Sequence, residues 1–193
     1  MKFFTQEELK ILGIIFLVLI ILLLANFRVS FRKARDAQRK GDIDTIMNGL
    51  EDGFFKSFGY FPQSSGDGEI LACKGPETKY DEKEKKFINL IACEWGKDAL
   101  ADLADERFPP FIKTLPKDPQ EAKGIHYQYF SNGRRYQLFV SLEGKNEAEY
   151  NPKIERRGIM CGQRVCNYGK AFSNTSLYKT IEEYEQELLR EGK

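Results

Sequence analysis

The stretch ILGIIFLVLIILLLA, residues 11–25, decides the fold of this chain of 193 residues. It is apolar throughout apart from Gly13, and Leu9 and Phe27 extend it to about the 20 residues that span the hydrocarbon core of a bilayer. A helix that is hydrophobic all round lies in lipid or deep in a large core, and a chain of this length can hardly build such a core. The stretch therefore predicts a membrane-spanning helix.

A cleavable secretory signal is the alternative for this segment. Such a signal has a basic start, a shorter apolar core and a cleavage site of small residues. Here Asn26, Phe27 and Arg28 follow the block, without an Ala-x-Ala pattern. We therefore favour a retained anchor.

Three short motifs lie around the apolar block. FTQEEL occupies residues 4–9, ARDAQRK occupies residues 34–40 and GYFP occupies residues 59–62. This arrangement resembles the type IV pilins and the type II secretion pseudopilins, whose mature chains begin Phe-Thr-x-x-Glu and run directly into an apolar helix. The resemblance covers residues 3–62 and extends more weakly to Glu143, through an LPKDP turn and the tyrosine-containing strands after it.

The resemblance implies roles for residues at the N-terminus. Phe4, followed by Thr5, corresponds to the mature N-terminal residue, and Glu8 to the acid that meets the terminal amine of a neighbouring subunit. A carboxylate at the edge of lipid is costly unless it is paired, which favours a register that offers it a cation. The alternative is that Glu7 and Glu8 are first-turn residues at the positive end of the helix dipole, with Lys10 as an internal partner.

One residue departs from the family pattern. The peptidase of the family cuts after a small residue, usually Gly, but Phe3 precedes Phe4 here. An uncleaved chain would keep its start and lack the free amine that Glu8 needs. Two hypotheses follow. The chain is either a structural subunit, major or minor, of a pilus or pseudopilus, or a signal-anchored binding module that does not polymerise and presents its head outside the membrane.

The charges on either side of the span favour an orientation opposite to the one that the resemblance implies. Lys2 and Lys10 precede or enter the span, and more cations follow it: Arg28, Arg32, Lys33, Arg35, Arg39 and Lys40. This bias alone would place the globular part in the cytoplasm. The cations after the span form either a solvated helix face, offset by nearby aspartates, or a site for anionic lipid head groups.

The cysteines favour an oxidising compartment, in agreement with the resemblance. Their even number and short spacings are typical of disulfides, and we favour local pairing of Cys73 with Cys93 and of Cys161 with Cys166. The other two pairings remain open. A four-thiolate zinc site is less consistent with these spacings, and free buried thiols are a further alternative.

Composition and motifs favour a protein that is not an enzyme. The 30 basic and 29 acidic residues leave a net charge of +1, so no global field recruits nucleic acid. The single histidine, His126, lies on an expected strand beside aromatic residues, where a structural role is favoured. We find no phosphate loop, nucleophile elbow or dinucleotide fingerprint, and we expect no catalytic residue, metal site or cofactor.

An apolar stripe after the span predicts that the helix continues to about Phe58. Three glycines along it, Gly41, Gly49 and Gly53, favour a bend. The stripe consists of Ile43, Ile46, Met47, Leu50 and Phe54.

Periodicity predicts further elements in the head. We expect helices at about 83–95 and 98–105 and a sheet that begins after the prolines of residues 115–119. We also expect a C-terminal helix at about 180–190, with Thr180 and Glu183 as its capping box. Residues 125–131 and 135–143 alternate as two strands around an Asn132-Gly133 turn. The residues expected to cover the helix are Ile125, Tyr127, Tyr129, Tyr136, Leu138, Val140 and Leu142.

The expected fold class is α+β and pilin-like: a long N-terminal helix packed on a small antiparallel sheet, with an extra C-terminal helix. Residues 1–27 form the anchor, residues 28–62 the amphipathic stalk and residues 63–193 the head. We expect a single-pass protein of the cytoplasmic membrane with an extracytoplasmic head, in a periplasmic or extracellular filament. Its expected partners are other pilin-like subunits, inner-membrane assembly machinery and membrane lipid, but not nucleic acid.

Overall fold

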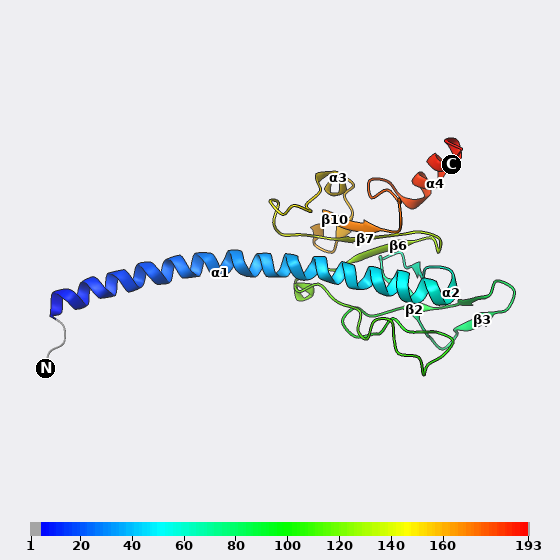
Figure 1. The fold of residues 1–193 in the computed structure, drawn as a ribbon, viewed down its shortest axis with the longest axis horizontal. Helices are drawn as coiled ribbons and strands as arrows, with labels where there is room; N and C mark the ends of the chain where they lie inside the picture. The colour runs from blue at the N-terminus through cyan, green and yellow to red at the C-terminus, as the bar shows by residue number, and fades with distance from the viewer. Residues whose placement is uncertain (1–4, 193) are drawn as a thin grey trace.

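One long helix supports the rest of the chain in the computed structural model, which describes residues 5–192 (Figure 1). Helix α1 (Gln6–Asn48) continues through a π-helical segment, η1 (Gly49–Phe55), into α2 (Lys56–Phe58). Gly59 ends the rod with a φ of 75°, a conformation that glycine adopts without steric cost. The predicted continuous helix to about Phe58 is confirmed.

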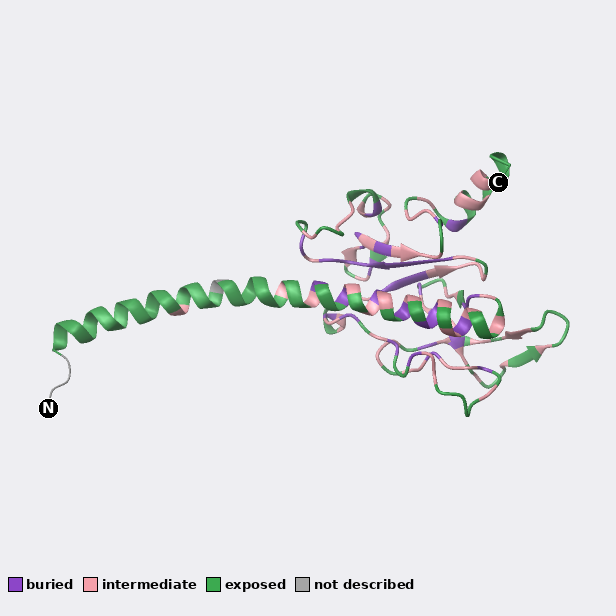
Figure 2. Ribbon diagram, viewed as in Figure 1, coloured by how far each residue is buried: buried purple, intermediate pink, exposed green. Residues whose placement is uncertain are grey.

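The two halves of this rod differ in their surroundings. Figure 2 shows the N-terminal half almost wholly exposed and the distal half set into the head. Phe16 is 64% exposed and Leu22 56% exposed, although both lie in the most apolar part of the chain. The helix is long and apolar enough to cross a membrane by length and composition.

The predicted stripe on the distal half of the helix is buried. Ile43, Ile46, Leu50 and Phe54 are each fully buried, and Met47 packs against the same cluster. This stripe forms the centre of the main hydrophobic core, which draws on both sheets of the head.

The first sheet is formed by residues 63–92, which come before the prolines of residues 115–119 in the sequence. Strands β1 (Gln63–Ser64), β2 (Ile70–Cys73) and β5 (Ile91–Ala92) form an antiparallel sheet in the order β1-β2-β5. Strands β3 (Lys79–Asp81) and β4 (Lys86–Ile88) form a separate hairpin. The prediction that the sheet starts after residues 115–119 is therefore wrong.

The second sheet contains the predicted hairpin. Strands β6 (Gln128–Ser131), β7 (Tyr136–Val140) and β10 (Tyr168–Ala171) pair antiparallel in the order β10-β7-β6. A small hairpin of β8 (Met160–Cys161) and β9 (Arg164–Val165) lies between β7 and β10 in sequence. In Figure 1 the two sheets lie on either side of the distal half of the rod.

Both faces of β7 are buried, each in a different cluster. The seven residues predicted to cover the helix are all buried, and all but Ile125 join the main core with the stripe. Phe139 faces away from the helix and packs with Ile154 and the Cys161–Cys166 disulfide. We did not predict this second cluster.

The turn between β6 and β7 is displaced by one residue from the prediction. Ser131 pairs with Tyr136, and the Asn132 amide donates a 3.3 Å hydrogen bond to the Arg135 carbonyl. Gly133 and Arg134, rather than Asn132 and Gly133, are therefore the central residues of the turn, and Gly133 has a φ of 83°. The Asn132 side chain instead accepts from the Arg134 and Arg135 amides.

The helix predicted at about 83–95 does not form. Lys85 and Asn89 adopt positive φ angles of 49° and 56°, which interrupt any helix, and Phe87 pairs with Tyr80 in the β3–β4 hairpin. The apolar spacing of Phe87, Leu90 and Ile91 fits a helix, but over such a short run it fits strands equally well.

The helix predicted at about 98–105 is also absent from the described structure. Asp98 accepts a hydrogen bond from the Glu94 amide, and Asp102 accepts from the Ala104 and Asp105 amides. These side chains bind backbone amides locally and so compete with helix formation. Leu100 instead forms a β-bridge with Ile112.

Three short helices complete the fold: η2, a 3-10 helix (Glu121–Lys123), α3 (Pro152–Glu155) and α4 (Ile181–Arg190). The C-terminal helix was predicted, together with its capping box, in which Thr180 and Glu183 exchange hydrogen bonds. Ile181 at its start is buried, and Tyr184 and Leu188 are half-buried.

Two glycines of the rod permit close packing against the segment that follows the first sheet. A Cβ on Gly49 would lie 2.4 Å from Ile112 Cγ1, and a Cβ on Gly53 would lie 2.4 Å from Phe111 Cγ. Both glycines lie in the π-helical segment, where the regular hydrogen-bond ladder is interrupted. Close approach therefore explains Gly49 and Gly53, whereas Gly41 faces open space.

Candidate anchoring and assembly surface

The N-terminal half of α1 presents apolar side chains around its whole circumference. None of its most apolar window is buried against the head. Exposed apolar surface on this scale is rare on proteins that remain monomeric in water. Lipid or the helices of neighbouring molecules are the two surroundings that would cover it.

The described part of the N-terminus forms a capping box. The Glu8 carboxylate accepts from the Thr5 amide at 2.7 Å and from the Thr5 hydroxyl at 2.9 Å, and Thr5 Oγ1 accepts from the Glu8 amide. Lys10 pairs with Glu7 at 2.8 Å, and not with Glu8 as the internal alternative expected. Phe4 lies outside the described residues, so the proposed pairing of Glu8 with a terminal amine stays a prediction.

A buried arginine fixes the head to the rod. Arg39 is fully buried, and its Nε and Nη2 donate to the two carboxylate oxygens of Asp118 at 2.7 and 3.0 Å. Its Nη1 donates to Asp36 and to Glu143, both at 2.9 Å. Because Asp118 and Glu143 lie in the head, this arginine ties two of its segments to α1.

The partners of Arg39 are themselves held in place. Asp36 accepts from the Glu143 and Gly144 amides at 2.8 and 2.9 Å. Arg35 donates two hydrogen bonds to Glu143, at 2.6 and 2.8 Å. These bonds from Arg35, with those from Arg39, lower the pKa of Glu143 to about 2 against the opposing effect of burial. We call Arg35, Asp36, Arg39, Asp118 and Glu143 the ion clamp.

Two tyrosine hydroxyls add to the clamp along the buried face of the helix. Tyr127 donates to Asp42 and Tyr136 donates to Glu51, each at 2.6 Å. The pKa of both tyrosines is raised, mainly by burial and in addition by these hydrogen bonds to carboxylates. The sequence did not reveal that Asp42 and Glu51 have partners in the head.

The ion clamp revises our interpretation of the basic cluster. Arg35, Arg39 and Lys40 all pair with carboxylates of the head, Lys40 with Glu147 and Glu149. Arg39 also pairs with Asp36, one of the nearby aspartates expected to offset the cluster. These three cations therefore have a structural role that the sequence did not predict, which is to join the helix to the head.

Two disulfides stabilise the head, with the local connectivity favoured from the spacing. Cys73 at the end of β2 is bonded to Cys93, and Cys161 of β8 to Cys166, each with a Cα–Cα distance of 5.2 Å. Disulfides persist in oxidising compartments and are rare where glutathione keeps thiols reduced.

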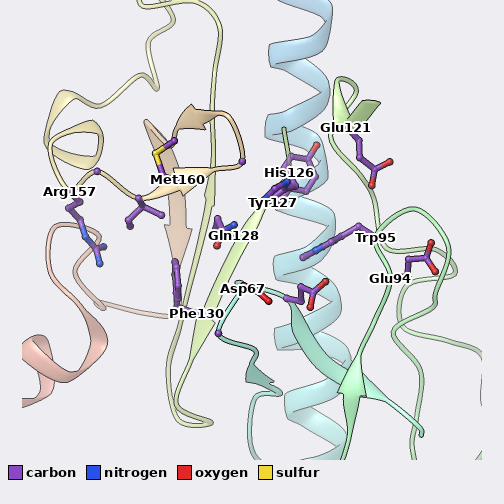
Figure 3. A pocket seen from close by; sticks show the side chains of 15 residues that line it. Asp67, Glu94, Trp95, Glu121, His126, Tyr127, Gln128, Phe130, Arg157 and Met160 are labelled. Atoms are coloured by element: carbon purple, nitrogen blue, oxygen red, sulfur yellow. The ribbon is translucent and has the colours of Figure 1, made fainter. Parts of the chain in front are cut away.

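A groove of about 910 Å³ opens on the head (Figure 3). It is lined by Trp95, His126 and Arg157 and by four acids: Asp67, Glu69, Glu94 and Glu121. Glu94 and Glu121 pair with nearby lysines. Within residues 5–192, no hydrogen bond joins the His126 imidazole to a carboxylate, so the groove shows no preformed acid–base pair.

The loop acids do not gather into a metal site in the described part of the chain. Within residues 5–192, no group of three or more His, Cys, Asp or Glu side chains is arranged to hold an ion.

No protein-family model, curated protein or solved structure matches this chain.

Proposed function

We propose that the chain is a membrane-anchored structural subunit of a filament of the type IV pilus or type II secretion pseudopilus kind. The observation that carries this proposal is the single unbroken rod, α1 to α2. One half of it exposes apolar side chains on every side, and the other half forms the core of a disulfide-bonded head. In the filament the apolar halves pack together and the heads face outward.

The ion clamp supports this role because it makes the head and rod one mechanical unit. Arg39 and its partners cross from α1 to two separate segments of the head, and the stripe adds apolar packing further along. A force or displacement applied to the anchor is therefore transmitted to the head. This property suits a subunit that is extracted from the membrane and stacked.

The disulfides support an extracytoplasmic head. They outweigh the charge bias around the span, because that bias acts only as a statistical preference during insertion. Titration of the free thiols in freshly isolated, denatured protein tests the proposed location. Four reactive thiols would contradict the proposed location.

The second candidate function is a non-polymerising anchored module, for which there are two observations. Phe3 occupies the position where the family has a small residue before the cleavage site. In addition, Glu8 is satisfied within its own chain by Thr5. Such a module would keep Met1 and present the head to a ligand.

Intact mass measurement of the native chain separates the two functions. A chain that begins at Phe4 supports processing and assembly, whereas one that begins at Met1 supports the static anchor. Isolation of envelope filaments provides the second criterion, because filaments that lack this chain would contradict the structural role.

A matched pair of substitutions tests the role of Glu8. Glu8→Gln removes the charge but keeps the capping box, since Gln also serves at this position of the motif. If Glu8 pairs with a neighbour's amine, Glu8→Gln abolishes incorporation into filaments, whereas Glu7→Gln leaves it unchanged. Equal incorporation of both variants would show that Glu8 only caps its own helix.

A further inference from the structure

Three cations occupy the segment of α1 between the apolar half and the ion clamp. Arg28 and Lys33 are exposed, and Arg32 is half-buried. Within residues 5–192, none of the three forms an ion pair with a carboxylate. Arg32 donates one hydrogen bond, to Asn146 at 3.2 Å, and its Nε is buried without a partner.

The next cations along α1 differ in having partners in the head. Arg35, Arg39 and Lys40 are all paired with carboxylates of the head. The head acids Glu143 and Glu147 are thereby occupied. The positive charge of Arg28, Arg32 and Lys33 is consequently not neutralised by direct pairing with the head.

The position of these cations along the helix corresponds to the level of lipid head groups. At 1.5 Å per residue, Lys33 lies about 9 Å beyond Phe27, the last residue of the apolar block. The head-group region adds roughly 5–8 Å on each side of the hydrocarbon core. Long basic side chains can also reach back along the helix towards the interface.

Apolar side chains alternate with the cations in the same segment. Val29 is 47% exposed and Phe31 is 62% exposed, and Phe31 lies against Phe27 with ring centroids 6.2 Å apart. Val29 and Phe31 therefore continue the exposed apolar surface of the helix past Phe27. A mixture of aromatic and basic side chains is typical of the membrane interface.

We propose that Arg28, Arg32 and Lys33 form a binding site for the phosphate groups of anionic phospholipids. The planar fork of each arginine suits phosphate oxygens, and the exposed side chains of Arg28 and Lys33 are accessible to them. This site rests on the membrane anchor of the proposed function but not on filament assembly. It also explains cations that the charge bias would place on the other side of the membrane.

The site would hold the head against the membrane surface while the chain is still in the bilayer. Figure 1 shows the head beginning beside α1 near the end of this segment, where Arg32 contacts Asn146. Since the ion clamp fixes the head to the helix, binding of lipid phosphates at Arg32 would also fix the height of the head. Departure from the membrane would then require these contacts to break.

Native mass spectrometry of the full chain tests this proposal. The chain is released from mixed micelles that contain equal amounts of phosphatidylcholine and phosphatidylglycerol, and the retained lipids are counted. Each basic residue near an anionic surface favours binding by roughly fivefold. We expect the chain to retain phosphatidylglycerol roughly tenfold or more over phosphatidylcholine at low salt, and less at high salt.

Two triple variants with the same change in net charge provide the comparison. Arg28→Gln, Arg32→Gln and Lys33→Gln together should abolish the preference for phosphatidylglycerol. The control is Lys79→Gln, Lys83→Gln and Lys85→Gln, which alters exposed, unpaired cations of the β3–β4 hairpin, at the end of the head away from the span (Figure 1). It should keep the preference.

Three results would overturn the proposal. They are equal retention of the two lipids by the unaltered chain, a preference that does not respond to salt, and an equal loss of preference in both triple variants. Retention of neither lipid by a folded chain would overturn the anchor itself, and the site with it. This measurement does not depend on filament formation. If the chain forms no filament, the proposed lipid site is therefore unaffected.

Discussion

The two halves of the N-terminal rod share one secondary structure but have different surroundings. From Ile11 to Leu24 the side chains are apolar apart from Gly13, and nearly all of them are exposed, whereas Ile43, Ile46, Leu50 and Phe54 form a stripe that is fully buried. Between them, residues 28–40 contain the unpaired cations and the start of the ion clamp. The surroundings of the helix therefore change within about four turns.

This difference teaches that the pattern, and not the hydrophobicity alone, decides what covers a helix. A stripe needs one partner surface, and the head provides it. Apolar residues on every face need partners on every face, and the head covers none of the apolar window. Substitutions in the two halves should accordingly affect different properties of the molecule.

The largest loss of head stability is expected for Arg39→Ala. This change leaves Asp36 and Asp118 charged, buried and without their shared cation, which costs about 3–5 kcal/mol. Urea unfolding in detergent, followed by the fluorescence of the single tryptophan, measures the loss. The matched control is Lys33→Ala, which should stay within about 0.5 kcal/mol of the unaltered chain. Equal effects would mean that the clamp does not stabilise the head.

A pair of leucine substitutions compares the two halves directly. Leu50→Ala empties a fully buried position of the core and should destabilise the head by about 2–5 kcal/mol. Leu22→Ala lies in the exposed apolar half and should leave urea unfolding of the head unchanged. Similar destabilisation by both substitutions would refute the separation of the halves.

The glycines allow a smaller test of close packing along the distal half. Gly53→Ala would place a Cβ 2.4 Å from Phe111, and relief of this overlap should cost about 1–3 kcal/mol. Gly41→Ala meets no atom within 4 Å and should stabilise the helix by up to about 1 kcal/mol. Opposite signs in thermal unfolding would support the packing, and equal signs would argue against it.

The smallest effect concerns pH and the clamp residue Glu143. Its pKa in the folded chain is about 2, below the value of about 4.3 for an unfolded chain. Its contribution is therefore complete above the unfolded pKa and is lost as pH falls towards 2. Between pH 7 and pH 4 the loss should be about 0.6 kcal/mol. In Glu143→Gln this part of the pH dependence should disappear; an unchanged slope would exclude Glu143 as its source.

Much of the rod could be predicted from the sequence because its signals are local. Residues 11–25 form one continuous apolar run, and the stripe at Ile43, Ile46, Leu50 and Phe54 repeats at helical spacing. The β6–β7 strands and the capping box of α4 follow equally local rules. The local cysteine pairing was favoured from the even number of cysteines and their short spacings.

The ion clamp could not be predicted because its members are far apart in sequence. Arg39 and Asp118 are 79 residues apart, and Arg35 and Glu143 are 108 residues apart. On a helical pattern these cations resemble solvent-facing residues, and only the tertiary fold shows that Arg39 is buried. The two helices predicted within residues 83–105 failed for local reasons. The short apolar run at Phe87, Leu90 and Ile91 fits a strand as well as a helix, and Phe87 pairs in the β3–β4 hairpin. Further along, the side chains of Asp98 and Asp102 bind local amides and override a weak helical period.

The most direct test of this account is extraction of the native chain from its membranes. Alkaline carbonate should leave it in the membrane pellet, and detergent should release it with residues 9–27 intact by mass spectrometry. A chain that retains these residues and yet dissolves as a monomer in buffer without detergent would contradict the account.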